Sequence, residues 1–152
     1  MKLNHVVSAS QFDSKTLQTI FSLTDKVKSG KYDKKALSGK IMATLFYQPS
    51  AIKGETLEDT IRIVNFYSDL IVIRHSESGA ADLASQYSKV PVINAGDGVG
   101  EHPTQALLDL YTIYEKFGRL DNLTGVLVGD PLNSRTIHSL IRGLALYPKN
   151  TI

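Results

Sequence analysis

The chain has 152 residues, of which 42% are hydrophobic and 21% charged, and its formal net charge is +2 at pH 7. This is the composition of an ordinary globular domain, and so small a charge gives no reason to expect nucleic acid or a membrane surface as a partner. The sequence contains no cysteine, which excludes disulfides, thiolate metal sites and a thiol nucleophile. No apolar run approaches the length of a membrane span and the first residues lack a signal-peptide pattern, so we expect a cytoplasmic, soluble protein.

The first predicted element is a helix. Asp13 or Ser14 can cap it, its apolar positions follow the three-and-four spacing of a buried stripe, and Gly30 is suited to end it. Several lysines lie near its end and in the loop that follows. We interpret them as a solvated surface rather than a nucleic-acid site.

Four apolar runs indicate strands, and helical patterns alternate with them. Thr56 with Asp59 resembles a capping box at the start of one helix, and Ser134 lies in the loop before the last. Strands alternating with helices predict βαβ units, and therefore an α/β fold with an open parallel sheet and flanking helices. The predicted strands are 41–47, which reads as buried on both faces, 70–74, 90–93 and 125–129; the predicted helices between and after them are 56–64, 79–87, 104–117 and 135–147.

A glycine-rich loop joins the third predicted strand to the next helix. Gly96, Gly98 and Gly100 break regular structure there, and such a loop lies at the carboxyl end of a parallel strand, where open α/β sheets bind ligands. His102 and Gln105 follow at the helix start, with unpaired backbone N–H groups between them that suit a carbonyl or an anion. By spacing alone, a plain strand-to-helix turn explains the loop equally well.

The segment 94–109, Asn-Ala-Gly-Asp-Gly-Val-Gly-Glu-His-Pro-Thr-Gln-Ala-Leu-Leu-Asp, closely resembles the signature of the aspartate carbamoyltransferase family. The match is long and free of gaps. The resemblance implies transfer of the carbamoyl group of carbamoyl phosphate to L-aspartate, in pyrimidine biosynthesis. It implies no cofactor and no metal ion. It also implies a carbamoyl-phosphate-binding domain over residues 1–102, and a linking helix with the first βα unit of an aspartate-binding domain over residues 103–152.

The resemblance assigns roles to residues at the strand ends. Arg74, in a segment similar to the family's Arg-His pair, would bind the phosphate and carbonyl side of carbamoyl phosphate, together with Ser50. His102 would donate a hydrogen bond to the carbamoyl carbonyl and Gln105 would bind its amide end. Preorganised donors of this kind stabilise the oxyanion that forms when an amine attacks the carbonyl. Without the resemblance, Arg74 could instead form an ion pair with Asp82 or Glu77.

Two further residues would serve aspartate. Lys53 lies in a segment similar to the family's Lys-Gly-Glu-Thr loop, whose lysine reaches into the active site of a neighbouring subunit. Arg135 lies in a segment similar to the family's Arg-Thr-x-His-Ser-Leu motif and would bind a carboxylate of aspartate. The family therefore implies a homotrimer with shared active sites, and possible regulatory subunits.

The sequence departs from the family at residues 50/51. The family's Ser-Thr-Arg-Thr-Arg motif should follow Ser50, but Ala51 and the Lys-Gly-Glu-Thr loop come at once, so that one α–β unit and its phosphate loop are missing there. The aspartate-binding half is also incomplete. Losing these cationic contacts should cost several kcal/mol of transition-state binding, at roughly 2–4 kcal/mol per charged contact. Catalysis by this chain alone should be weak.

Three other functions remain to be compared with this one. The first is a catalytically inactive carbamoyltransferase homologue that acts as an assembly or regulatory partner, which the missing phosphate loop motivates. The second is the related ornithine enzyme, which the sequence favours less because its ornithine-binding cysteine loop is absent. The third is a generic α/β nucleotide-binding domain, which is disfavoured because no Gly-x-Gly-x-x-Gly follows the first strand.

Overall fold

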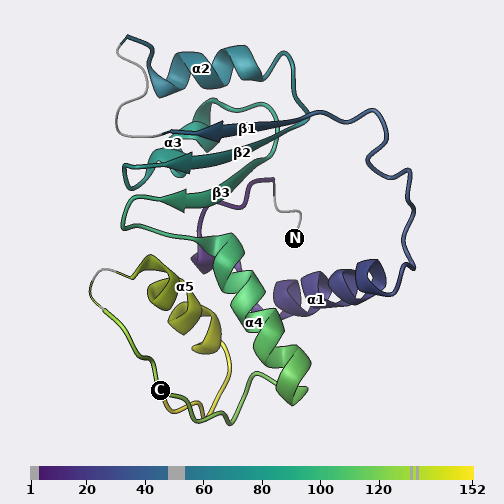
Figure 1. Cartoon of the computed structure of the whole chain (residues 1–152), viewed down its shortest axis with the longest axis vertical. Coiled ribbons are helices and arrows are strands. Elements are labelled where there is room, and N and C mark those ends of the chain that lie inside the picture. Colours follow the sequence, from purple (N-terminus) through teal and green to yellow (C-terminus); the bar gives the residue numbers. More distant parts are fainter. Residues whose placement is uncertain (1–3, 48–53, 131, 133) are drawn as a thin grey trace.

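The computed structural model describes residues 4–47, 54–130, 132 and 134–152. A small parallel sheet with two helices on one side forms one half of the molecule, and three helices form the other half (Figure 1). The elements in chain order are the 3-10 helix η1 (Ala9–Gln11), α1 (Ser14–Lys28), β1 (Met42–Phe46), α2 (Leu57–Val64), β2 (Leu70–His75), α3 (Ala80–Tyr87), β3 (Val92–Asp97), α4 (Pro103–Phe117) and α5 (Arg135–Leu144).

The sheet has the strand order β1-β2-β3, and all three strands are parallel. Met42 pairs with Leu70, and Ile71 pairs with Val92. Because parallel strands need right-handed crossovers and the order advances in one direction, α2 and α3 fall on the same face of the sheet. The predicted α/β fold class, with an open parallel sheet and flanking helices, is confirmed.

A hydrophobic core joins α2 and α3 to the sheet. Ile61 of α2, Ile71 and Ile73 of β2, Ala84 of α3 and Val92 of β3 are each no more than 1% exposed. Alternate residues of a strand point to opposite faces, so Ile71 and Ile73 both face the helices. Their burial holds the carboxyl end of β2, and the arginine that follows Ile73, in place.

The prediction that residues 41–47 are buried on both faces is wrong. β1 alternates between exposed and half-buried residues, and Met42 and Phe46 are 59% and 63% exposed. In the described part of the chain no helix covers the face of β1 on which Met42 and Phe46 lie. The preceding helix, α1, packs against α4 instead, well away from the strand (Figure 1).

A second core holds the helical half together. Leu17 and Phe21 of α1, Leu110 of α4 and Leu144 of α5 lie in one buried cluster with Leu120. This cluster brings the helix before the sheet into contact with the two helices after it. Nothing in this packing tests the division at residues 102/103, which stays a prediction.

Several helix ends follow the predicted signals. The Asp13 side chain accepts a hydrogen bond from Thr16 N at 2.7 Å and caps α1. Thr56 caps α2 by accepting from Asp59 N at 3.1 Å. Gly118 ends α4 with a φ of 68°, the left-handed conformation that glycine adopts at low cost.

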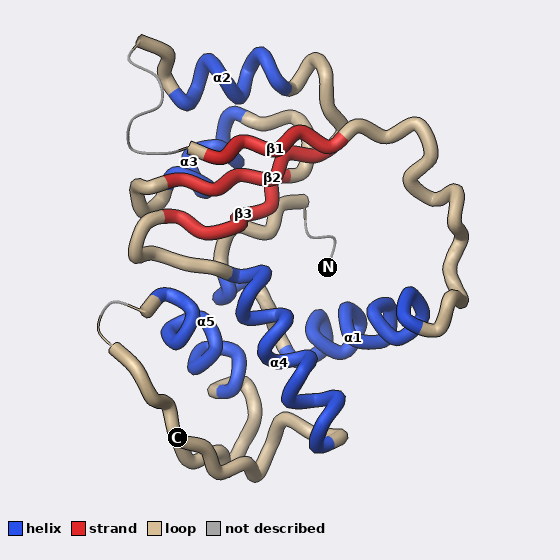
Figure 2. The backbone as a smooth tube through the Cα atoms, viewed as in Figure 1, coloured by secondary structure: helices blue, strands red, loops and turns tan. Residues whose placement is uncertain are grey.

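The predicted strand at 125–129 does not form. Figure 2 draws the chain between α4 and α5 as loop, and Val126 and Val128 are 84% and 91% exposed. Within the described residues its neighbourhood makes one isolated bridge, between Thr124 and Thr151. An apolar run becomes a strand only when a partner satisfies its backbone groups.

No helix in the described residues is both long enough and apolar enough to cross a bilayer.

Candidate functional site

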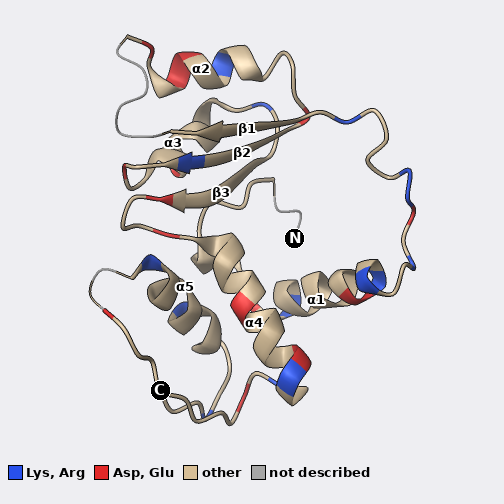
Figure 3. Cartoon of the chain, viewed as in Figure 1, with Lys and Arg blue, Asp and Glu red and all other residues tan. Residues whose placement is uncertain are grey.

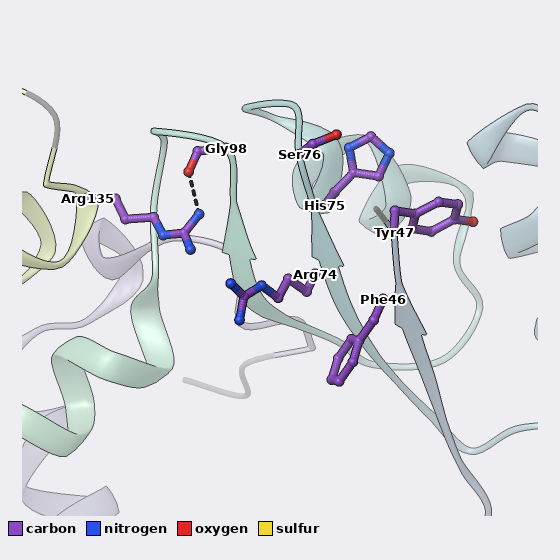
Figure 4. Close-up of a pocket in the computed structure, with 7 residues that line it drawn as sticks. All are labelled: Phe46, Tyr47, Arg74, His75, Ser76, Gly98 and Arg135. Carbon is purple, nitrogen blue, oxygen red and sulfur yellow. Dashed lines mark hydrogen bonds between the residues drawn. The ribbon is translucent and has the colours of Figure 1, made fainter. Parts of the chain in front are cut away.

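A cavity of about 420 Å³ opens at the carboxyl ends of the strands (Figure 4). This is the edge of the sheet at which parallel α/β folds bind ligands. Two arginines, from β2 and from α5, are among the residues around it. The lining residues are Phe46, Tyr47, Arg74, His75, Ser76, Gly98 and Arg135.

Arg74 is an exposed residue at the end of β2, and its side chain extends across the cavity (Figure 4). Among the described residues it forms no ion pair, and neither Glu77 nor Asp82 approaches it closely enough to do so. The alternative in which Arg74 serves an internal ion pair is therefore wrong for this structure. Its guanidinium is available to an anionic ligand.

Arg135 and His102 meet over Gly96. A Cβ atom added to Gly96 would lie 3.1 Å from Arg135 Cζ and 3.2 Å from His102 Cδ2. Gly96 also has a φ of +112°, which side chains rarely tolerate. Only glycine at this position lets the guanidinium and the imidazole approach so closely. Arg135 also donates to the carbonyl oxygen of Gly98.

The shape of the loop between β3 and α4 depends on Asp97, which is 5% exposed. Its two carboxylate oxygens accept from Gly79 N and Glu101 N, each at 2.8 Å. Gly98 follows with a φ of +48°, and a Cβ there would lie 2.7 Å from Ser76 O. The loop therefore runs tightly along the end of β2, which is why residues of both strands border one cavity.

Blue segments at the end of β2 and at the start of α5 lie on either side of this loop in Figure 3. Arg74 and Arg135 extend toward one another from these two elements (Figure 4). Two guanidinium groups aimed at one space favour an anion there, because each repels the other unless a negative charge lies between them.

His102 is positioned by its own helix. It is the N-cap of α4, and its Nδ1 accepts a hydrogen bond from Gln105 N at 3.3 Å. With Nδ1 acting as an acceptor, the proton of the neutral ring is on Nε2, which can donate to a ligand. Burial lowers the pKa of His102, and the positive charges of Arg135 and Arg74 lower it further. The ring is therefore neutral at pH 7.

Gln105 lies one turn into α4, and its side-chain NH₂ donates to Asp109 Oδ1 at 2.9 Å. Its side-chain oxygen is the atom left to accept from an amide. Gln105 and His102 do not themselves line the cavity, although His102 borders Gly96 beside Arg135. Of the predicted site residues, Arg74, His102 and Arg135 come together, and the side-chain NH₂ of Gln105 is bonded to Asp109 on the same helix.

Two predicted site residues, Ser50 and Lys53, lie outside the described residues. Sequence reasoning missed Phe46, Tyr47 and His75, which line the cavity; Tyr47 and His75 lie in ring contact, 4.9 Å between centroids. The rule that strand ends meet at one edge could have identified all three. Among the described residues, no group of three or more His, Asp or Glu side chains comes together to hold a metal ion.

The chain is similar in sequence to known carbamoyltransferases. The sequence profile of the family described as aspartate/ornithine carbamoyltransferase, carbamoyl-P binding domain, matches residues 50–115. The chloroplastic aspartate carbamoyltransferase of Arabidopsis thaliana is 44% identical over 178 aligned positions, which cover 96% of this chain and 46% of that protein.

Solved structures agree with the sequence comparison. The catalytic subunit of M. jannaschii aspartate transcarbamoylase has a TM-score of 0.87 at 39% identity, over 97% of this chain and 58% of that chain. Aspartate transcarbamoylase from Trypanosoma cruzi, in complex with carbamoyl aspartate and phosphate, has a TM-score of 0.86 at 34% identity, over 98% and 58% of the two chains.

This chain spans about half the length of the curated relatives it matches. The alignment with the A. thaliana protein also contains positions that this chain lacks. It has 178 positions, whereas 96% of 152 residues is about 146, so about 32 positions of that relative have no residue of this chain opposite them. By its sequence and its parallel sheet, the chain is similar to aspartate carbamoyltransferases over nearly its whole length, and residues 50–115 match the carbamoyl-phosphate-binding domain of the aspartate/ornithine carbamoyltransferase family.

Proposed function

We propose that this chain binds carbamoyl phosphate in the cavity at the strand ends and serves the transfer of its carbamoyl group to the amine of L-aspartate, giving N-carbamoyl-L-aspartate and phosphate for pyrimidine synthesis. The observation that carries the proposal is the meeting of Arg135 and His102 over Gly96, with Arg74 on the other side of the cavity. Two fixed cations and a neutral hydrogen-bond donor suit a ligand that has both a phosphate and a carbonyl group.

Each of these residues has a distinct role in the reaction. Arg74 neutralises the phosphate of carbamoyl phosphate, and Arg135 binds a carboxylate of aspartate from the start of α5. Neutral His102 donates from Nε2 to the carbamoyl oxygen, where negative charge grows as the amine attacks. Gln105 accepts from the carbamoyl NH₂ group through its side-chain oxygen.

The chemistry needs no covalent intermediate. The amine nitrogen of aspartate forms a bond to the carbonyl carbon and gives a tetrahedral intermediate. The carbon–oxygen bond to phosphate then breaks, phosphate leaves with that electron pair, and the nitrogen loses a proton to the departing phosphate or to water. Because the phosphate leaves as an anion between cations, the arginines favour both its binding and its departure.

The relatives support this substrate pair. The Trypanosoma cruzi aspartate transcarbamoylase has been solved with carbamoyl phosphate and aspartate, and with carbamoyl aspartate and phosphate. The names of the similar curated proteins also favour aspartate over ornithine as the acceptor. The alternative, an inactive homologue that acts as an assembly or regulatory partner, has no comparable support.

Because this chain lacks positions that its relatives have, we expect its catalysis to be weak. We infer that the roughly 32 unmatched positions of the A. thaliana relative include one α–β unit near residues 50/51. A helix and a strand fit within that length. Without a phosphate loop there, we expect the chain to bind carbamoyl phosphate weakly and to turn over slowly.

The assembly is part of the same proposal. A cytoplasmic homotrimer with shared active sites would let one chain contribute a cation to the site of the next. Regulatory subunits would be additional partners. Light scattering of the purified chain should give the mass of three chains, and a monomer at all concentrations would remove this part of the proposal.

The function is tested by two measurements on the 152-residue chain. Isothermal titration with carbamoyl phosphate should show saturable binding, and an assay for carbamoyl aspartate should show slow turnover with aspartate and none with ornithine. Arg74→Ala should weaken carbamoyl phosphate binding at least tenfold, since a charge-assisted contact contributes about 1.5–3 kcal/mol.

Arg119→Ala is the matched control. Arg119 is an exposed arginine that donates to Asn122 O, well away from the cavity at the strand ends, so its loss should leave binding unchanged. Carbamoyl phosphate binding without any turnover would favour the inactive homologue. No binding by the wild-type chain would contradict both functions.

A further inference from the structure

One side of α5 is attached to the glycine loop by a row of polar residues. Arg135, Ser139 and Arg142 are four and three positions apart, a spacing that places them on one side of a helix. Arg135 donates to Gly98 O, and the backbone N–H of His102 donates to Ser139 Oγ at 3.4 Å. Arg142 donates to the carboxylate of Glu101.

Glu101 is the residue on which these contacts converge. Its side chain is 19% exposed, and besides Arg142 it accepts hydrogen bonds from Ser8 Oγ at 2.9 Å and Ala9 N at 2.6 Å. One carboxylate therefore joins the N-terminal helix η1, the glycine loop and α5. These three segments are far apart in the sequence.

The backbone of Glu101 is fixed as well. Its N–H donates to Asp97 Oδ1 at 2.8 Å, and its carbonyl oxygen accepts from Asp97 N at 3.2 Å. The next residue is His102. The loop before it contains glycines, which have the largest backbone freedom, so contacts from outside the loop are needed to hold one conformation.

We propose that Glu101 is a positioning residue for His102, and that its bonds to η1 and to α5 keep the imidazole against Arg135 at the edge of the cavity. Glu101 is not among the residues that line the cavity. The inference rests on the proposed function in that the site being positioned is the carbamoyl phosphate site. Its first test requires no ligand.

The first test measures the pKa of His102 in the ligand-free chain. The titration is monitored by NMR of the imidazole nitrogens in the wild type, in Glu101→Gln and in Glu101→Ala. Groups that face the ring are Arg135, Arg74 and Asp109. Loss of a nearby carboxylate by itself can only lower the pKa of a histidine. Release of the ring into solvent raises it. A rise in the pKa of His102 in Glu101→Ala therefore identifies lost positioning.

The rise in the pKa of His102 should differ between Glu101→Gln and Glu101→Ala. The amide introduced by Glu101→Gln keeps one oxygen that can accept from Ala9 N, and its NH₂ can donate to Ser8 Oγ, but the charge that pairs with Arg142 is lost. The rise should therefore be smaller than in Glu101→Ala. Arg142→Ala, which leaves the bonds to η1 intact, should also give a small rise. It remains informative if Glu101→Ala fails to fold.

The second test is the affinity for inorganic phosphate, measured by isothermal titration. Glu101→Ala should bind phosphate about tenfold more weakly, because supporting residues around a site commonly contribute factors of this size. Glu115→Gln is the matched control, since Glu115 is an exposed carboxylate on α4 that pairs with Lys28. It should leave both the titration and the affinity unchanged.

The outcomes separate this inference from the proposed function. If the wild-type chain binds no phosphate but Glu101→Ala raises the pKa of His102, the positioning role stands and the function fails. If the wild type binds phosphate and Glu101→Ala changes neither the affinity nor the titration of His102, the positioning role is overturned.

Discussion

Two apolar runs of similar sequence behave in opposite ways. Residues 70–74 lie in the central strand β2 (Leu70–His75), and Ile71 and Ile73 in it are no more than 1% exposed. Residues 125–129 stay in a loop, and Val126 and Val128 are 84% and 91% exposed. β2 has a strand on each side and helices on one face. The second run has neither in the described residues, so burial, rather than composition, decided which run became a strand.

The largest loss of stability is expected from a substitution in the buried strand β2. Ile73→Ala removes buried methyl groups between the sheet and the helices α2 and α3, so the free energy of unfolding should fall by about 2–5 kcal/mol. Urea unfolding followed by circular dichroism measures it. A change below about 1 kcal/mol would mean that this core is loosely packed.

A smaller loss of stability is expected from a substitution at the contact between α4 and α5. A Cβ on Gly143 would overlap the buried side chain of Leu110, so Gly143→Ala forces Leu110 or the backbone of α5 to shift and should cost about 1–3 kcal/mol of stability. Gly125→Ala gives a reference, since no atom lies within 4 Å of a Cβ there and its φ is outside the left-handed region. Equal losses in the two variants would remove the claim of tight packing between α4 and α5.

The pH dependence of stability should report on His102. Because its pKa is lowered in the folded chain, the unfolded chain binds more protons as pH falls through about 6.5, the ordinary value for histidine. Stability should therefore be complete above that pH and decrease below it. Urea unfolding at about pH 7.5 and about pH 5.5, on either side of that value, should show this decrease in the wild type, and a smaller one in His102→Gln. The same slope in both proteins would exclude His102 as its source.

The smallest effect is expected at the exposed run. Val126→Thr should change the free energy of unfolding by less than about 0.5 kcal/mol, because the side chain is already in water. Hydrogen exchange sharpens the comparison, since amides of Ile71 and Asn94 should be protected and those of Val126 and Val128 should exchange quickly. Protection at Val126 would mean that a partner pairs with this run in solution.

The sequence predicted local structure well where the signal was itself local. Asp13 and Thr56 cap the helices that they were expected to cap, because a cap depends on residues within one turn. The prediction was wrong where burial depends on residues far away in the sequence. Residues 41–47 were predicted to be covered on both faces, but α1, which precedes them, packs on α4.

The candidate site shows the same division. Arg74 and His102 could be placed at one sheet edge from strand order alone, and the family resemblance suggested their roles. Gln105 was expected to bind the amide end of carbamoyl phosphate, and its side-chain oxygen is left for that role because its NH₂ donates to Asp109. The contact of Arg135 with Gly98 O and the convergence of three segments on Glu101 join residues 37 to 93 positions apart, which no local pattern could indicate.

By itself, the sequence determined the alternation of helices and strands, the glycine loop and the residue types that suit an anion with a carbonyl group. Those properties follow from the backbone preferences and chemistry of neighbouring residues. Only the tertiary structure decided which apolar runs became strands, how Arg135 reached His102 over Gly96, and which carboxylate joined η1 to α5. Those outcomes depend on contacts between distant segments, whose free energies appear only once the chain is packed.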